Sequence, residues 1–220
     1  MILGQIGLAL WAKKIEPKLS LGSLFCAALW LDLVWPLFLW SGLESMDIDS
    51  SIQGVWPVRM DDIAYSHSFV MACVWGGVAG LGYYHRRRRG FRAFVLAGLV
   101  VAHWGVDMIF HRHDLPVLPW GGRPVGWGLW NSMNLTIGVQ FAMLGLGIIG
   151  YMWAVRSEHL KVKPQFWGAM MVIAGLGLGA TITVPQSQDE VVNAGLILWL
   201  LIPLGFWIDH KRPETYEAIR

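Results

Sequence analysis

Three ionisable residues recur at four-residue spacing in an apolar run long enough to form a helix. His103, Asp107 and His111 lie within FVLAGLVVAHWGVDMIFHRHDL. Residues four apart lie on one face of an α-helix, so the three side chains form a single polar stripe. Because ionisable groups are costly to bury in lipid, such a stripe normally faces a cavity, a bundle interior or a partner.

The spacing within this stripe is suited to binding a metal ion. Both His103 with Asp107 and Asp107 with His111 are i, i+4 pairs, which is the spacing of the two histidines in zinc-binding helices. A straight helix separates His103 from His111 by about 12 Å, so a second helix must supply further ligands. The candidates are Asp32, in LWLDLVWP, and His67, in YSHSF.

The predicted ligands are therefore Asp32, His67, His103, Asp107 and His111. Zinc is the expected ion, with manganese and iron as alternatives. A metal ion with an open coordination position lowers the pKa of bound water and makes a nucleophile near neutral pH. Asp107 and Asp114 are the candidate catalytic carboxylates, the latter as a base.

Other interpretations of the same residues stay open. Asp32 could make a structural hydrogen bond between helices, and His67 could bond its serine neighbours. His103 and Asp107 could form a purely structural ion pair. His67 and His103 could also be the axial ligands of a haem, although no c-type attachment motif is present.

The composition indicates a membrane protein. The chain has 220 residues, is 55% hydrophobic and only 15% charged, whereas soluble domains are roughly 25% charged. Runs of about 20 apolar residues, the length that spans a bilayer as a helix, recur along it. We expect an all-α, polytopic transmembrane helical bundle forming one domain over residues 1–220, with about six full spans and a short N-terminal helix. The segments are 2–12, 20–43, 64–84, 93–112, 127–153, 165–184 and 190–208.

Basic residues are concentrated in alternate loops. Of the 17 Lys and Arg residues, all but Arg59, Arg112 and Arg123 follow the first, third, fifth or last segment. The positive-inside rule places those loops and the C-terminus in the cytoplasm. The arginine run at 86–89 is then a topology signal with some attraction for anionic lipid, and we expect no nucleic-acid partner.

This topology brings the polar residues of several segments to one depth near the outer surface. Gln5, Asp32, His67 and the 103–111 stripe all fall there, as does the sequence WNS at 130–132. We expect them to face one cavity that opens outward. The remaining histidines of the basic side, His85, His159 and His210, are expected to be solvated.

Several motifs resemble those of a known family. YSHSF, AHWGVDMIFHRHDLP and GLWNS, with AKKIEPKLSLGSLFCAALWLDLVWP near the start and LLIPLGFWIDHKR near the end, are similar to landmarks of bacterial proteins in or near the membrane-bound metal-dependent hydrolase group. The resemblance covers nearly the whole chain. It implies a bacterial inner-membrane location and polar site roles for Asp32, His67, His103, Asp107 and His111. Relatives tend to have a histidine where this chain has Gln5, a weak ligand for transition metals.

Two functions follow from these observations. The first is a metal-dependent hydrolase that acts on a lipid-like or membrane-proximal substrate in the bilayer. The second, motivated by Gln5 and by the 14 Trp residues, is a non-catalytic accessory subunit that packs with other subunits of a bioenergetic or photosynthetic membrane complex. A small transporter is a third possibility, because embedded carboxylates and histidines can relay protons, but no matching pair of interrupted helices supports it.

Overall fold

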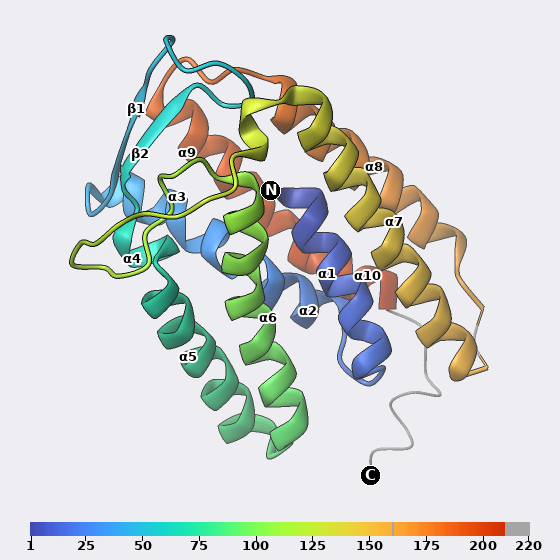
Figure 1. Ribbon diagram of the computed structural model, residues 1–220. Helices are drawn as coiled ribbons and strands as arrows, with labels where there is room; N and C mark the ends of the chain where they lie inside the picture. The colour runs from blue at the N-terminus through green and yellow to red at the C-terminus, as the bar shows by residue number, and fades with distance from the viewer. Residues whose placement is uncertain (160, 210–220) are drawn as a thin grey trace.

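Helices make up most of this computed structural model, in which residues 1–159 and 161–209 are described (Figure 1). The predicted all-α class is confirmed. The helices are α1 (Ile2–Ile15), α2 (Leu21–Ala28), α3 (Trp30–Ser41), α4 (Ala64–His67), α5 (Phe69–Arg87), α6 (Gly90–Phe110), α7 (Met133–Ser157), α8 (Pro164–Ile182), α9 (Gln188–Ile197) and α10 (Leu201–Asp209), with short 3-10 turns η1 (Leu129–Asn131) and η2 (Leu198–Leu200).

The number of membrane-crossing helices is smaller than the six predicted. Within the described residues, four helices are long and apolar enough to span a bilayer, namely α6, α7, α8 and the run Gln188–Asp209. The bent pair α2–α3 would be a fifth. α5 is not among them, since its 19 residues contain four glycines and end in a His-Arg-Arg sequence that lowers its hydropathy. The four apolar helices are consistent with a membrane protein.

The predicted segment 20–43 is broken rather than continuous. α2 ends at Ala28, Leu29 is non-helical, and α3 leaves at an angle of 54°. The break leaves carbonyl groups at the end of α2 without helical partners. It also puts Asp32 in the first turn of α3, where the positive end of the helix dipole stabilises a carboxylate.

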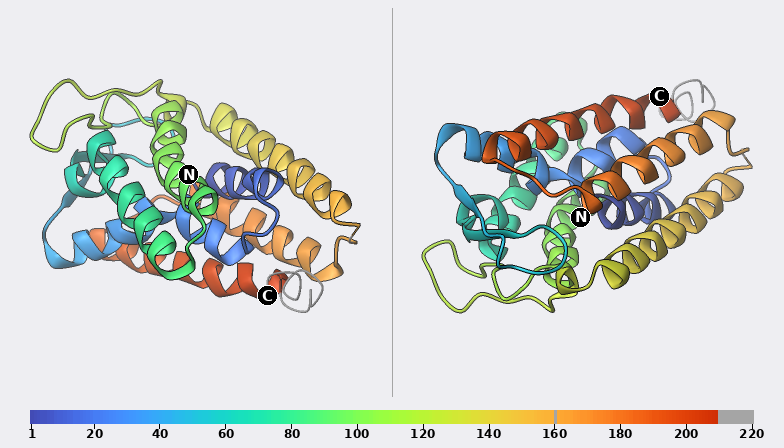
Figure 2. Two further views of the ribbon diagram at one scale, coloured as in Figure 1. Left: turned by 90° about the horizontal axis from the view of Figure 1, so that it is seen from below. Right: turned by 90° about the horizontal axis from the view of Figure 1, so that it is seen from above.

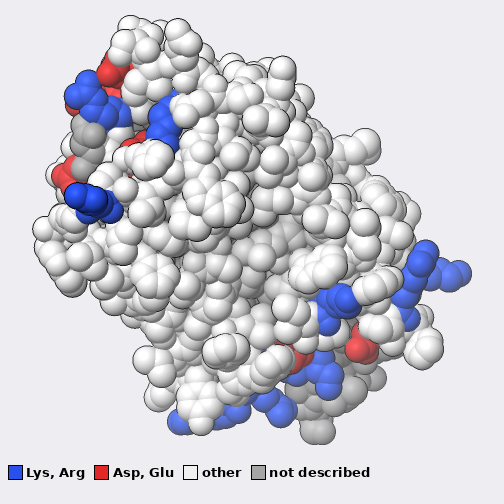
Figure 3. Space-filling view, in the orientation of Figure 1, with Lys and Arg blue, Asp and Glu red and all other residues white. Residues whose placement is uncertain are grey.

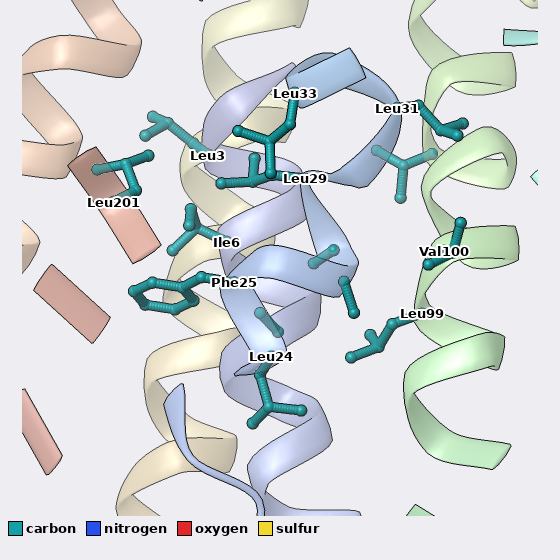
Figure 4. Close-up of a cluster of buried hydrophobic side chains, with 14 of the residues drawn as sticks. Leu3, Ile6, Leu24, Phe25, Leu29, Leu31, Leu33, Leu99, Val100 and Leu201 are labelled. Atoms are coloured by element: carbon teal, nitrogen blue, oxygen red, sulfur yellow. The ribbon is translucent and has the colours of Figure 1, made fainter. Parts of the chain in front are cut away.

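The short N-terminal helix α1 occupies the middle of the bundle. Figures 1 and 2 show it lying between α6 and α7, and it packs most extensively against α7, followed by α2 and α6. Leu3 and Ile6 of α1 belong to a buried apolar cluster with Phe25 of α2 and Leu99 of α6 (Figure 4). α1 is therefore too short to span a bilayer but buries nine of its residues inside the protein.

Small residues allow α1 and α7 to approach closely. A Cβ atom at Gly7 would overlap the carbonyl group of Met143, and one at Gly147 would overlap the carbonyl group of Gly7. Glycine at such contacts lets helix backbones pack together in apolar surroundings, where dispersion forces replace the hydrophobic effect. This packing fixes the position of α1 and of the polar residues at its N-terminal end.

A two-stranded sheet, which no sequence pattern predicted, covers one end of the bundle. β1 (Ser45–Ile48) pairs antiparallel with β2 (Val58–Asp62). The Arg112 guanidinium donates hydrogen bonds to the carbonyls of Gln53, Val55 and Trp56 and to Asn131 Oδ1. Arg112 thereby ties the β1–β2 loop to η1.

Basic residues gather at the opposite end. The last turns of α1, α5 and α7 each carry Lys or Arg, and Figure 3 shows these cations along the lower end of the molecule. Acidic and basic side chains are mixed at the end that carries β1 and β2 (Figure 3). Lys211, Arg212 and Arg220, which were predicted to lie on the same cytoplasmic side, fall outside the described residues.

Candidate metal centre

Four of the predicted site residues meet between three helices. Asp32 comes from α3, His67 from the end of α4, and His103 and Asp107 from successive turns of α6. His67, His103 and Asp107 are buried and Asp32 is nearly so. One ligand atom each from Asp32, His67 and His103 lies within 4.8 Å of the others. The prediction that separate segments bring these side chains together is therefore confirmed by the geometry.

The distances between donor atoms suit a small metal ion. His103 Nε2 lies 3.0 Å from Asp107 Oδ2 and 3.8 Å from Asp32 Oδ1. His67 Nε2 lies 3.6 Å from Asp32 Oδ1 and 3.7 Å from Asp107 Oδ2. Four ligands about 2.0–2.1 Å from a tetrahedral zinc ion are roughly 3.3 Å apart. The same carboxylates occupy the space between the two imidazoles, which disfavours a haem plane there.

The backbone of α2 sets the proton position on His103. His103 Nδ1 lies 2.6 Å from the carbonyl oxygen of Ala28, and a carbonyl group can only accept a hydrogen bond. Nδ1 therefore carries a proton, and when the ring is neutral its Nε2 lone pair faces the carboxylates. This arrangement, in which the far nitrogen of a histidine is held by a hydrogen bond, is typical of metal ligands.

A chain of hydrogen bonds from Glu44 through Ser66 sets the proton position on His67. Ser66 Oγ donates to Glu44 Oε2 over 2.6 Å, and His67 Nδ1 lies 2.7 Å from Ser66 Oγ. Because the serine proton is used toward Glu44, His67 Nδ1 must donate to Ser66 Oγ. The Nε2 lone pair of His67 then faces Asp32 and Asp107. The expected bond between His67 and a serine neighbour is thus present, and it leaves the ligand nitrogen free.

Glu44 is anchored at the start of α4. Its Oε1 accepts hydrogen bonds from the backbone N–H groups of Tyr65 and Ser66, at 2.8 and 2.7 Å. Burial raises the pKa of Glu44 above its ordinary value, and the hydrogen bonds from Ser66 and Tyr65 oppose this shift. With three donors directed at it, the side chain has the hydrogen-bond partners that a carboxylate requires.

The surroundings of one atom of the cluster, Asp107 Oδ2, favour a bound cation. Asp107 Oδ2 is buried without a hydrogen-bond donor among the described residues, yet it faces the Nε2 atoms of His67 and His103. When both rings are neutral with Nδ1 protonated, Asp107 Oδ2 and the two Nε2 atoms are three acceptors that point at one another. Buried acceptors of this kind are costly without a partner. A bound divalent cation would satisfy all of them, so the residues present fit a metal ion.

Comparisons with known proteins give no match that supports the family resemblance of the motifs. No family model matches the sequence, and searches of curated proteins and of solved structures also give no match.

Gln5, predicted to face the same cavity, lies inside the cluster. Its Nε2 donates to Asp107 Oδ1 over 2.9 Å and lies 3.4 Å from His103 Nε2, while its Oε1 has no partner within the described residues. The amide therefore orients Asp107 through the carboxylate oxygen that does not face the histidines. The backbone nitrogen of Met1 lies 3.7 Å from Asp32 Oδ2.

Two predicted site residues lie away from the cluster. His111 packs against the Trp130 ring in a tilted arrangement with centroids 4.1 Å apart, and its Nδ1 lies 3.0 Å from Asp114 Oδ1. α6 ends at Phe110, so His111 lies just beyond the helix on which the stripe was predicted. We therefore do not place His111 among the metal ligands, and Asp114 serves as its partner. His85, His113 and His159 are exposed, and His210 lies outside the described residues.

A cavity of about 100 Å³ adjoins the cluster. Asp32, His67, Asp107 and His111 contribute to its wall, and most of the remaining wall is apolar. Trp35 comes from α3, Trp56 and Met60 from the β-sheet region, and Val191 and Leu198 from the C-terminal helices. The predicted shared cavity thus draws on segments far apart in the sequence, and its outward opening stays a prediction. Trp130 also lines it, whereas Asn131 binds Arg112 and Ser132 caps α7.

Sequence reasoning missed Glu44 and Arg112 as contributors to this site. Glu44 was visible only as one of several acidic residues in a loop, and its distance of 23 positions from His67 gave no periodic signal. Arg112 was counted as a topology charge. Only the folded loops show that Glu44 sets His67 and that Arg112 holds the Trp56 backbone against η1.

Replacing Glu44 with Gln is expected to weaken metal binding about tenfold, a typical effect of removing an outer hydrogen-bond partner. The Gln amide would donate to Ser66 Oγ, so the serine proton would turn toward His67 Nδ1 and the ring proton would move to Nε2. Metal titration calorimetry checks this, with Asp49→Asn as the control because Asp49 is a loop carboxylate bonded to Ser51 and Arg59. Equal affinities in Glu44→Gln and wild type would contradict the assigned role.

Proposed function

We propose that this protein is a membrane-embedded, metal-dependent hydrolase whose metal ion, zinc in the first instance, is held by Asp32, His67, His103 and Asp107. The observation that carries the proposal is the convergence of two imidazole Nε2 atoms and the Asp32 carboxylate around Asp107 Oδ2, a buried acceptor without a hydrogen-bond partner in the described chain. Mixed nitrogen and oxygen donors at this spacing are those that zinc, manganese and iron prefer.

The protein residues have separate roles in this proposal. When bound, the metal ion would act as a Lewis acid and activate water for hydrolysis. Ala28 and Ser66 hold the two histidines in the ligand tautomer. Gln5 fixes the Asp107 carboxylate. Asp32, the most exposed of the four at 16% side-chain exposure, is the carboxylate best placed to accept a proton from a substrate or a water in the cavity.

The substrate class follows from the cavity wall. A polar scissile group would reach the His/Asp end, while an apolar portion would contact Trp35, Met60 and Leu198. Such a division suits an amphiphile, in keeping with a location in the bilayer. His111, held by Asp114, lies on the same wall and can donate or accept a hydrogen bond at the substrate.

The distribution of charge supports an orientation for this site. α1, α5 and α7 end at the basic end of the molecule, and by the positive-inside rule that end lies in the cytoplasm. The site lies toward the other ends of these helices, so we place it in the outer half of a bacterial inner membrane, with the C-terminus on the cytoplasmic side.

The test of this function is metal-dependent hydrolysis by the purified full-length protein. We expect about one equivalent of transition metal per chain by mass spectrometry, and cleavage of acyl esters that is lost on chelation and restored by zinc or manganese. Asp32→Asn should abolish cleavage, whereas His85→Ala should not, because His85 is exposed at the far end of α5. Metal-free protein, or cleavage insensitive to chelation, would overturn the proposal.

Gln5 favours one alternative, a non-catalytic accessory subunit. The amide occupies a position beside His103 and Asp107 where the resemblance implies a stronger ligand, so the cluster is also compatible with a degenerate site. Exposed indoles such as Trp40 and Trp120 offer surfaces for partner subunits. Isolation of the protein in a stoichiometric membrane complex without metal would support this alternative over the hydrolase.

A further inference from the structure

A second cavity lies at the basic end of the molecule and belongs to neither the metal centre nor its apolar cavity. It has a volume of about 720 Å³. Five cationic side chains from three segments line it, namely Lys18, Arg86, Arg87, Arg89 and Arg92. The α1–α2 loop, the end of α5 and the start of α6 bring them together.

Most of these cations have no protein partner. Arg92 Nε lies 3.5 Å from Glu16 Oε1, but within residues 1–159 and 161–209 no ion pair or hydrogen bond engages the side chains of Lys18, Arg86, Arg87 or Arg89. Like charges held around one hollow repel each other. A bound anion would offset this repulsion, and guanidinium groups favour phosphate because their N–H groups can engage two of its oxygens at once.

The other walls of this basic pocket favour a lipid over a free ion. Tyr83 and Phe206 add aromatic surface to the lining, and Ser20 and Ser23 add hydroxyl groups. The same two helices also expose large apolar side chains, with Leu81 of α5 70% exposed and Phe94 of α6 72% exposed. A molecule with a phosphate head and hydrocarbon tails matches this sequence of surfaces from cationic to apolar.

We propose that the basic pocket binds the headgroup of an anionic phospholipid, with its phosphate between Arg86 and Arg89 and its acyl chains along α5 and α6. Basic pockets between membrane helices on the cytoplasmic side are suited to such headgroups. The site is independent of the metal centre, so its test stands whether or not the protein is a hydrolase.

The experiment is a lipid titration of full-length protein in detergent, followed by native mass spectrometry. We expect wild type to bind phosphatidylglycerol at least about tenfold more tightly than phosphatidylcholine, and inorganic phosphate at 10 mM, roughly the millimolar range of weak anion sites, not to displace it. The double variant Arg86→Gln/Arg89→Gln should lose this preference. Lys18→Gln, on a different segment, should weaken binding in the same direction.

A matched control is Arg156→Gln/Lys161→Gln, which removes two exposed cations at the same end of the molecule but outside the pocket. It should bind phosphatidylglycerol as wild type does. Equal weakening in this control would assign the effect to overall charge and overturn the site. Displacement by inorganic phosphate would overturn the lipid as occupant, and equal affinity for the two lipids would overturn the proposal altogether.

Discussion

His103→Ala is expected to lower metal affinity by more than about 100-fold, beyond the 10–100-fold typical of outer-partner variants. The change removes a ligand nitrogen that lies 3.0 Å from Asp107 Oδ2 and 3.8 Å from Asp32 Oδ1. It also leaves two carboxylates facing a single imidazole. The measurement is bound metal per chain after dialysis against a weak chelator, together with the dissociation constant from a competitive titration.

Two further variants separate metal binding from a purely structural ion pair. His103→Gln keeps a side-chain N–H that can reach the Ala28 carbonyl, so the fold should survive while binding is lost. Asp107→Asn keeps the shape and the contact from Gln5 but removes the charge, and should reduce binding similarly. His85→Ala is the control, because His85 is exposed. If wild type, His103→Ala, His103→Gln and Asp107→Asn all hold equal amounts of metal, the cluster is a structural ion pair and does not bind the metal.

Lys13→Met is expected to lower the free energy of unfolding by about 3–5 kcal/mol, the usual effect of breaking a buried ion pair on one side. Lys13 Nζ lies 3.1 Å from Asp209 Oδ2, and their side chains are only 8% and 7% exposed. The same carboxylate oxygen accepts a hydrogen bond from the Leu21 N–H over 2.6 Å. This pair joins α1, α2 and α10, and its loss leaves a buried charge without its cation.

A double variant tests that explanation. Adding Asp209→Asn to Lys13→Met removes the unpaired charge and keeps an acceptor for the Leu21 N–H, so more than half of the lost stability should return. Lys14→Met is the control, because Lys14 is exposed and stacks over Trp153 at 3.7 Å; it should cost about 1 kcal/mol or less. Unfolding in mixed micelles followed by circular dichroism gives the comparison. Equal losses at the two lysines would contradict the buried pair.

The sequence identified most of the residues that make the centre because their physical signature is local. An Asp or His in an apolar run is recognisable from its neighbours alone, as with Asp32 and His67, and the i, i+4 rule placed His103 and Asp107 on one face of α6. The same rule extended the stripe to His111, but α6 ends at Phe110 and His111 lies on the cavity wall beside Asp114. A periodicity argument assumes that the helix continues.

The predicted number of membrane spans was wrong for a related reason. Hydropathy measures only how apolar a segment is, so 20–43 was predicted to be one helix and α5 to be a membrane span. The bend at Leu29 leaves carbonyl groups that need hydrogen-bond donors from other parts of the chain. The Ala28 carbonyl is bonded by His103, which is 75 positions away in the sequence. The same break places Asp32 at a helix start beside the histidines.

The amino-acid sequence by itself determined the helical class, the apolar character of the long helices and the identity of the ionisable groups that lipid would exclude, because these depend on side-chain chemistry and short-range spacing. Tertiary structure alone decided which nitrogens of His67 and His103 face the carboxylates, that Glu44 acts on His67 through Ser66, and that Lys13 meets Asp209 across 196 positions. Hydrogen-bond partners and proton positions depend on distances of a few ångströms between remote segments, and only the packed chain fixes those distances.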